Sequence, residues 1–299
     1  MTGLYALIKR DCKLFFRDKG MFFTSLITPI ILLVLYATFL AKVYRDSFAS
    51  ALPEGLSVDP ALLDGTVGAQ LVSSLLAVCC VTVAFCSNLL MVQDKISGAR
   101  RDLEMAPVKH QTLALGYFVS SALATLIISL TALAVCLVYI SFVGWYFSFT
   151  DILLMVFDVV LIVLFGTALS SIVNYPLTTS GQASAVGTVV SAGYGFICGA
   201  YMPISNFGEG LQRVLSFLPG TYGTSLLRNH ALRGVYAEMA SEGFPPEVIE
   251  GIRDSIDCNL YFFGNKVSTG MMYIILVGAV ALLAVIYILI NACSKRKNK

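Results

Sequence analysis

The chain has 299 residues, of which 57% are hydrophobic and 13% are charged. Soluble proteins carry roughly 25% charged residues, so this composition excludes a soluble globular protein and indicates an integral membrane protein. The formal net charge of +2 says little by itself, because the position of each charge along a membrane chain decides its orientation. We expect membrane lipid among the partners of the chain, and no nucleic acid.

Residues 1–20 are predicted to form a basic amphipathic helix. Leu and Phe side chains fall on one side of such a helix, and Lys9, Arg10, Lys13 and Arg17 fall on the other. A helix of this kind lies in the headgroup plane of a membrane; a solvated basic flank of the first span is the alternative. No cleavable signal peptide is expected, because the charged segment before the first apolar run is too long for one.

Six apolar stretches are each long enough to cross a bilayer, which takes about 20 residues. They cover residues 21–41, 67–92, 112–142, 151–173, 181–201 and 268–291. The predicted fold is therefore all-α, with six transmembrane helices in a single domain of residues 1–299. Lys and Arg gather before the first span, in the loop of residues 93–110 and after the last span. The positive-inside rule then places both termini in the cytoplasm, and we expect a multi-pass protein of a bacterial cell membrane.

The two loops on the predicted cytoplasmic side differ in kind. Residues 93–110 mix basic and acidic side chains and contain Pro107, which predicts a short helix that ends before the proline. Residues 174–180 carry no charge and contain Pro176, so we expect only a tight turn there.

The fifth apolar stretch, residues 181–201, has small residues at every fourth position: Ala183, Gly187, Ser191, Gly195 and Gly199. In lipid, such a column lets another helix approach closely. The stretch breaks at Met202-Pro203, and the apolar piece that follows, through Pro219, is too short to span. We interpret residues 202–219 as a re-entrant hairpin on the outer side. Residues 220–267 form an extracellular segment, in which an amphipathic helix follows Pro245-Pro246.

Two polar residues lie within the predicted spans. Asp158 occupies the fourth span, where an ionised carboxylate costs several kcal/mol unless it is paired, protonated or close to water. It is either a polar point on a translocation route, including a proton site, or a partner in an interhelical hydrogen bond to Ser or Thr. Asn88 in the second span leaves the same two interpretations open, with packing favoured.

The sequence offers little support for a catalytic function. It has only two histidines, His110 and His230, which the predicted topology places on opposite sides of the membrane. The motifs H-E-x-x-H, G-x-S-x-G and G-x-x-x-x-G-K-[ST] do not occur, which excludes a zinc protease, a serine hydrolase elbow and a P-loop of those types. No catalytic, cofactor-binding or metal-ligating residue is predicted. The eight cysteines follow no disulfide or metal spacing, although Cys198 and Cys258 could pair on the outer face.

The order and spacing of several motifs resemble the ABC-2 family of ATP-binding-cassette transporter permease subunits, the type V exporter architecture. The resemblance rests on the basic N-terminal helix, on Gly98 with Leu103-Glu104-Met105-Ala106-Pro107, and on three later motifs. These are Met202-Pro203-Ile204, Leu218-Pro219-Gly220-Thr221-Tyr222 and Leu226-Leu227-Arg228. Together they cover nearly the whole chain.

The resemblance implies a role for each segment. Residues 2–20 would be the connecting helix, and residues 94–106 the coupling helix that meets a nucleotide-binding partner through Arg100, Arg101, Leu103 and Glu104. Pro203 and Pro219 would shape the re-entrant hairpin. The second and fifth spans would line a pathway between two identical or different permease subunits, packed through Gly187, Ser191, Gly195 and Gly199. ATP and Mg²⁺ would be bound by the separate ATPase subunit.

The expected function is therefore ATP-driven export of a drug-like, peptide or lipid substrate. A polysaccharide exporter is less favoured, because the segment after the hairpin is longer than in those exporters. Two other classes stay open. One is an ion-coupled secondary transporter that uses Asp158, although no inverted repeat is visible; the other is a membrane sensor or scaffold without transport.

Overall fold

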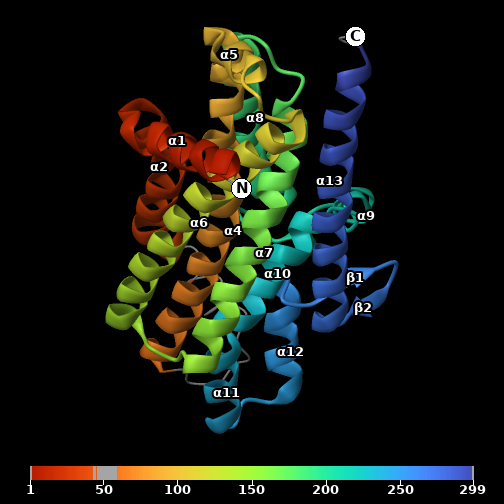
Figure 1. Cartoon of the computed structure of the whole chain (residues 1–299). Helices are drawn as coiled ribbons and strands as arrows, with labels where there is room; N and C mark the ends of the chain where they lie inside the picture. The colour runs from red at the N-terminus through yellow and green to blue at the C-terminus, as the bar shows by residue number, and fades with distance from the viewer. Residues whose placement is uncertain (1, 43–44, 46–58, 298–299) are drawn as a thin grey trace.

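The computed structural model describes residues 2–42, 45 and 59–297. Within these residues the chain forms twelve α-helices, two shorter helices of other pitch and one β-hairpin (Figure 1). In chain order they are α1 (Thr2–Arg17), α2 (Lys19–Leu35), the π-helix η1 (Tyr36–Leu40), α4 (Pro60–Ser97), α5 (Ala99–Met105), α6 (His110–Val143), α7 (Phe149–Asn174), α8 (Ser180–Ile197), the 3-10 helix η2 (Ile204–Asn206), α9 (Glu209–Leu215), α10 (Pro219–Ala231), α11 (Arg233–Ser241), α12 (Pro246–Ser255), β1 (Leu260–Phe262), β2 (Asn265–Val267) and α13 (Thr269–Lys297).

Helix α4 is the centre of the bundle. It is apolar on all sides, and such a helix is stable only when protein surrounds it. Nearly all of its residues from Gly65 to Val92 are buried, and α2, α6, α7, α8 and α10 pack around it. Gly166 of α7 allows one of these close approaches, because a Cβ there would lie 3.0 Å from the Cα of Val81.

Four described helices, α4, α6, α7 and α13, are long and apolar enough to cross a membrane. A fifth span results if α1 and α2, which meet at an angle of 74°, are counted as one broken span. Helix α8 has 18 residues and includes Gly181, Gln182 and Ser184 near its start, and it is not among these candidates. The all-helical membrane fold is confirmed, whereas the six-span topology stays a prediction.

The bend between α1 and α2 occurs at Asp18, whose side chain accepts a hydrogen bond of 3.1 Å from the Met21 N–H and begins α2. Helix α1 packs along α6. Its buried face includes Leu7, Asp11 and Phe15. The sequence predicts the amphipathic helix, but not the burial of Asp11 within that face.

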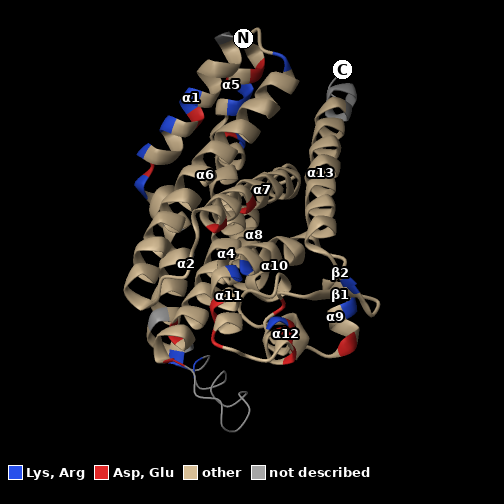
Figure 2. Cartoon of the chain, turned by 90° about the horizontal axis from the view of Figure 1, so that it is seen from below, with Lys and Arg blue, Asp and Glu red and all other residues tan. Residues whose placement is uncertain are grey.

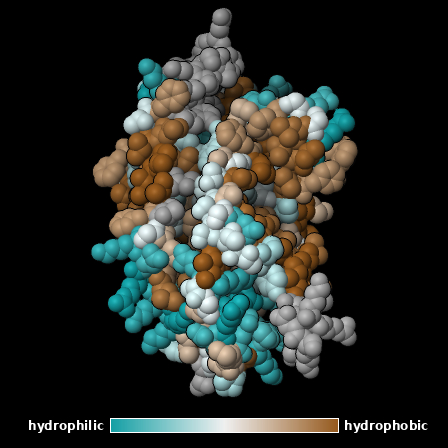
Figure 3. All heavy atoms as spheres, turned by 90° about the horizontal axis from the view of Figure 1, so that it is seen from above, coloured by the Kyte–Doolittle hydropathy of each residue, from teal (hydrophilic) through white to brown (hydrophobic). Residues whose placement is uncertain are grey.

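Charged residues divide between the two ends of the bundle. Figure 2 shows Lys and Arg, with fewer Asp and Glu, on α1 and α5 at the end where α13 finishes, and a mixture of acidic and basic residues on α9, α12 and β2 at the opposite end. We name these the α5 end and the α12 end. Figure 3 shows broad apolar areas on the face that it draws. Large apolar side chains are exposed on the long helices, among them Phe142 of α6 and Ile274 of α13. Exposed apolar area of this extent indicates contact with lipid.

Part of the segment after α8 enters the bundle, and the rest caps the α12 end. Helix α9 is short, whereas α10 is buried from Gly220 to Arg228 and packs against α4, α7 and α13. Gly223 permits this packing, because a Cβ there would lie 3.0 Å from Ile162. The structure therefore places residues 220–231, the first part of the predicted extracellular segment, inside the bundle. Helices α11 and α12 and the antiparallel β1–β2 hairpin, in which Leu260 pairs with Val267, complete the cap.

Candidate functional site

A cavity of about 670 Å³ lies between α2, α4 and α8. The predicted small-residue column supplies one of its walls through Ala183, Gly187 and Ser191. The other walls are mostly apolar and consist of Ile31, Leu32, Cys86, Leu89, Val92, Gln93, Ile96, Ser180, Ser184, Thr188, Ala192 and Tyr201. Because no atom lies within 4 Å of a Cβ built on Gly187, this part of the column borders space and packs against no helix of the described chain.

The last two members of the column have a different role. The ring of Tyr201 packs directly on Gly195, and its hydroxyl donates a hydrogen bond of 3.3 Å to the Ser191 carbonyl. Gly199 has a φ of +73° and follows the end of α8, a backbone conformation that favours glycine. Gly195 and Gly199 therefore shape the turn after α8, and they are not free to receive a second helix.

This turn is held by a buried cation, Arg228 of α10, which is 1% exposed. Its guanidinium donates to the Ile256 carbonyl at 2.8 Å, to Ser74 Oγ of α4 at 3.1 Å and to the Gly199 carbonyl. It also forms an ion pair of 3.4 Å with Asp257. One side chain therefore joins α4, the α8 turn, α10 and the segment after α12.

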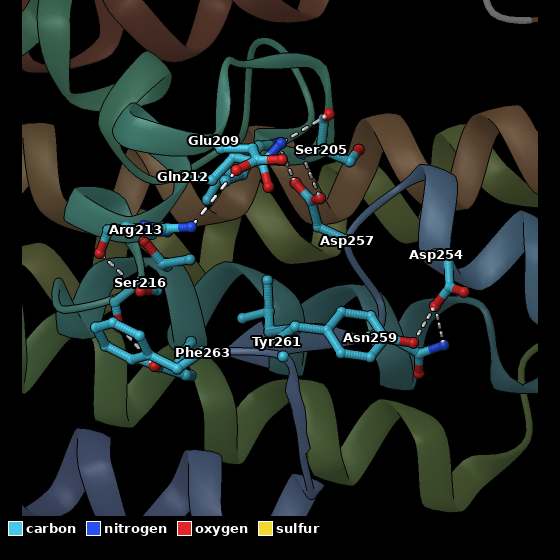
Figure 4. Close-up of a pocket in the computed structure, with 15 residues that line it drawn as sticks. Ser205, Glu209, Gln212, Arg213, Ser216, Asp254, Asp257, Asn259, Tyr261 and Phe263 are labelled. Atoms are coloured by element: carbon cyan, nitrogen blue, oxygen red, sulfur yellow. Dashed lines mark hydrogen bonds and ion pairs between the residues drawn. The ribbon is translucent and has the colours of Figure 1, made fainter.

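Asp257 completes this junction. Its carboxylate accepts hydrogen bonds from the backbone N–H groups of Ile204 and Ser205 (Figure 4). Burial raises the pKa of Asp257 above its usual value, while Arg228 and the two N–H groups act in the opposite direction. The predicted hairpin prolines flank this region: Pro203 precedes η2, and Pro219 begins α10, a helix position that tolerates the missing N–H.

Asp158 is fully buried in α7 and is paired with two residues that the sequence did not connect to it. Its Oδ2 lies 2.6 Å from Nδ1 of His230 in α10, and its Oδ1 accepts a hydrogen bond of 2.6 Å from the Tyr273 hydroxyl in α13. The predicted Ser or Thr partners are therefore replaced by a histidine and a tyrosine. His230 lies inside the bundle beside α7, and not on the outer surface.

Asn88 joins α4 to α7. Its amide donates to Ser170 Oγ at 3.1 Å and to Ser171 Oγ at 2.7 Å. The neighbouring Ser87 lies 2.6 Å from Ser121 Oγ of α6. This geometry is that of interhelical packing, and Asn88 does not line the cavity beside α8.

Helix α5 lies at the end of the bundle that is named after it and contains no buried residue. As predicted, it ends before Pro107. Arg100 pairs with Glu104 at 2.9 Å, Leu103 packs inward against the cluster around Met91 and Tyr117, and Arg101 is exposed. Of the four predicted coupling residues, Leu103 therefore packs inward, Arg100 and Glu104 pair with each other, and Arg101 is exposed.

A second polar network, which the sequence analysis missed, fixes α1 near this end. The Arg10 guanidinium binds both carboxylate oxygens of Asp94, at 2.7 and 2.9 Å, and Tyr117 donates to Asp94 at 2.6 Å. Arg10 also pairs with Asp11 at 2.8 Å. Burial raises the pKa of Asp11 to about 6, although Arg10 acts in the opposite direction. The sequence signal was the acidic residue within an otherwise basic amphipathic helix.

The two cysteines considered as a disulfide pair are both buried and free. Cys258 Sγ lies 3.4 Å from the Tyr236 hydroxyl, and Cys198 Sγ lies 3.8 Å from the Gly195 carbonyl. The proposed bridge is absent from the described residues, and each thiol has its own polar neighbour.

A bundle of long apolar helices around a buried central helix, with a cavity beside α8 and a polar helix at one end, defines a multi-pass membrane transport domain. The chain belongs to the ABC-2 type transporter family, whose sequence model it matches over residues 2–231. It is thus a permease domain of an ATP-binding-cassette transporter, a domain that has no ATPase activity itself. A comparison with curated proteins found no match.

We predict that Arg228→Met strongly destabilises the protein, because it leaves the Asp257 carboxylate buried without its cation. Removing one partner of a buried ion pair costs about 3–5 kcal/mol, which corresponds to a fall in Tm of roughly 6 °C or more. Thermal unfolding of the purified protein in detergent measures this loss. The matched control is Arg213→Met, since the side chain of Arg213 is 65% exposed and pairs with Glu209 at 3.4 Å; its Tm should hardly change. Equal Tm values for the two variants would contradict the conclusion that the buried Arg228–Asp257 pair stabilises the fold.

Proposed function

We propose that this chain is the permease subunit of an ATP-driven exporter in a cell membrane, with six spans and both termini in the cytoplasm. The α5 end would then face the cytoplasm and the α12 end the outside. Family membership and the basic residues of α1 support this orientation. The observation that carries the function is the cavity between α2, α4 and α8, which is bordered by the small-residue face of α8.

The partner of α5 would be the nucleotide-binding ATPase subunit, with its ATP and Mg²⁺. Arg101 and Met105 project outward, and Met105 is 79% exposed, so α5 offers a charged and an apolar contact to a docking surface. Leu103 anchors α5 to the bundle, and Arg100 lies over the Tyr175 ring, 5.8 Å from its centroid. Co-purification of an ATPase subunit with the tagged chain is the first test, and its absence would favour a sensor or scaffold.

We predict that Arg101→Glu uncouples ATP hydrolysis from transport without affecting insertion. The exposed guanidinium makes no hydrogen bond or ion pair within the described residues, so its reversal changes docking more than folding. The measurements are the yield of the co-purified ATPase subunit and the ATPase rate of the reconstituted complex. Glu104→Lys should act in the same direction, while Arg213→Glu at the other end serves as the control. Unchanged assembly and rate in both α5 variants would exclude the coupling role.

The substrate would pass along the cavity wall formed by α8. Its lining is largely apolar, which suits a drug-like, peptide or lipid substrate better than a glycan. Beside the cavity, Phe196 of α8 is 51% exposed, so α8 has surface left for a second permease subunit. The pathway would then lie between two such cavities.

We predict that Ser191→Leu blocks transport because the larger side chain projects into the cavity and holds α8 away from a partner. Val189→Leu is the control, since Val189 lies on α8 but does not line the cavity. Both variants should insert, because leucine is favourable within a span. ATP-dependent movement of an amphiphilic fluorescent dye in proteoliposomes, together with crosslinking of single-cysteine variants, distinguishes them. Equal transport by the two variants would place the pathway elsewhere.

The ion-coupled alternative depends on Asp158. Both of its carboxylate oxygens already have a partner, His230 and Tyr273, and it does not line the cavity between α2, α4 and α8. A structural role joining α7, α10 and α13 is therefore favoured.

We predict near-normal transport for Asp158→Asn, because an amide can still hydrogen-bond to both partners while it carries no charge. Dye transport is measured at matched levels of inserted permease and bound ATPase subunit. Loss of transport with normal assembly would support a proton-linked role and contradict this prediction.

A further inference from the structure

A second cavity, of about 750 Å³, opens at the α12 end, away from α2 and α4 (Figure 4). One wall is formed by the hairpin residues Ser205, Glu209, Gln212 and Arg213, and Thr221 and Tyr222 of α10 also line the cavity. The opposite wall includes Asp254, Asp257, Asn259, Tyr261 and Phe263 of the cap. That wall lies beyond residue 231, where the family match ends, so family membership assigns it no role.

The hydrogen-bond donors of this cavity are largely occupied by protein acceptors. The Gln212 amide donates to the Ser205 and Phe207 carbonyls, and the Tyr222 hydroxyl donates to the Ser216 carbonyl. On the other wall, the Asn259 amide donates to Glu250 and Asp254, and the Tyr261 hydroxyl donates to Asp254. Arg213 is the one lining cation, and it pairs with Glu209.

Hydrogen-bond acceptors, by contrast, remain available. Asn259 lines the cavity, and its Oδ1 accepts no hydrogen bond within the described part of the chain. This oxygen is not among the buried atoms that lack a partner, so it is open to the cavity and free to accept a hydrogen bond from a ligand. Beside it stands the Asp254 carboxylate, which accepts two hydrogen bonds but has no ion pair within the same residues. A donor with positive charge would satisfy both groups.

Two exposed aromatic rings also line this cavity. Tyr261 is 46% exposed and Phe263 is 62% exposed, and Figure 4 shows Tyr261 extending toward Asn259 and Asp254. Ring faces attract cations through their quadrupole. The described residues contain no group of three or more His, Cys, Asp or Glu side chains with metal-binding geometry, so an organic cation fits better than a metal ion.

We propose that this cavity binds a ligand with an ammonium group, which contacts Asp254 and Asn259 Oδ1 while its apolar part lies against Tyr261 and Phe263. The ligand would contact both the segment of residues 202–219 and the cap, because each of them forms one wall of the cavity. Either a soluble amine or an amine-bearing lipid headgroup has this chemistry. The inference does not depend on the proposed export function.

The test uses the full-length protein in detergent with 2-phenylethylamine, which is a cation at neutral pH, as the probe. Calorimetry should detect binding, while the neutral analogue 2-phenylethanol should bind much more weakly. Asp254→Asn keeps both acceptor contacts but removes the charge, so it should weaken binding about tenfold. Glu247→Gln is the matched control, because Glu247 is an exposed carboxylate of α12 that does not line the cavity; it should bind as the wild type does.

The Tm values of the unliganded variants show whether they fold. Native mass spectrometry of protein exposed to equal amounts of phosphatidylethanolamine and phosphatidylglycerol then separates the two sources. If the protein retains phosphatidylethanolamine selectively and the Asp254→Asn variant does not, the ligand is the lipid headgroup. If the protein binds the amine but retains no lipid selectively, the ligand is a soluble amine. Equal affinity for the amine and the alcohol, or equal binding by the Asp254→Asn and Glu247→Gln variants, overturns the proposal.

Discussion

The half of this permease domain near the α12 end depends on one buried cation. Arg228 and its counter-ion Asp257 are 1% and 4% exposed, and burying two charges is unfavourable unless hydrogen bonds satisfy the rest of both groups. The Gly199 and Ile256 carbonyls and the Ile204 and Ser205 N–H groups supply those bonds. These partners belong to different segments. The turn after α8, the segment of residues 202–219 and the cap can therefore reach their positions only together.

Polar contacts also determine how α4 packs against its neighbours. Helix association in lipid gains little from apolar burial, so polar contacts and close backbone approach define which helices meet. Asp94, near the C-terminal end of α4, binds Arg10 of α1, whereas Ser87 and Asn88 bond to α6 and α7. Ser74, further toward the N-terminal end, bonds to Arg228 of α10. These four residues give α4 a specific polar partner on each of four neighbouring helices, which fixes its register against them.

The sequence predicts the parts of this structure that depend on local pattern. Apolar length identified the long helices, and Pro107 predicted the end of α5. It could not predict partners that are distant along the chain: Asp158 bonds to residues 72 and 115 positions further on, and Arg10 pairs across 84 positions. The spacing of small residues in α8 identified a face but not what it borders. Ala183, Gly187 and Ser191 border a cavity, whereas Tyr201 covers Gly195, because the chain reverses at Gly199.

Helix α8 shows how these constraints can serve transport. It packs mainly against α4, and it is fixed near both ends by cations. Arg228 holds the turn that follows it, while Lys95 of α4 donates to the Tyr175 and Leu177 carbonyls in the turn that precedes it. Arg100 of α5 lies over the Tyr175 ring, 5.8 Å from its centroid. A displacement of α5 would therefore reach the start of α8 first. Because the middle of α8 borders a cavity at Gly187, it has space to shift on that side, whereas the buried junction at Arg228 opposes movement at the far end.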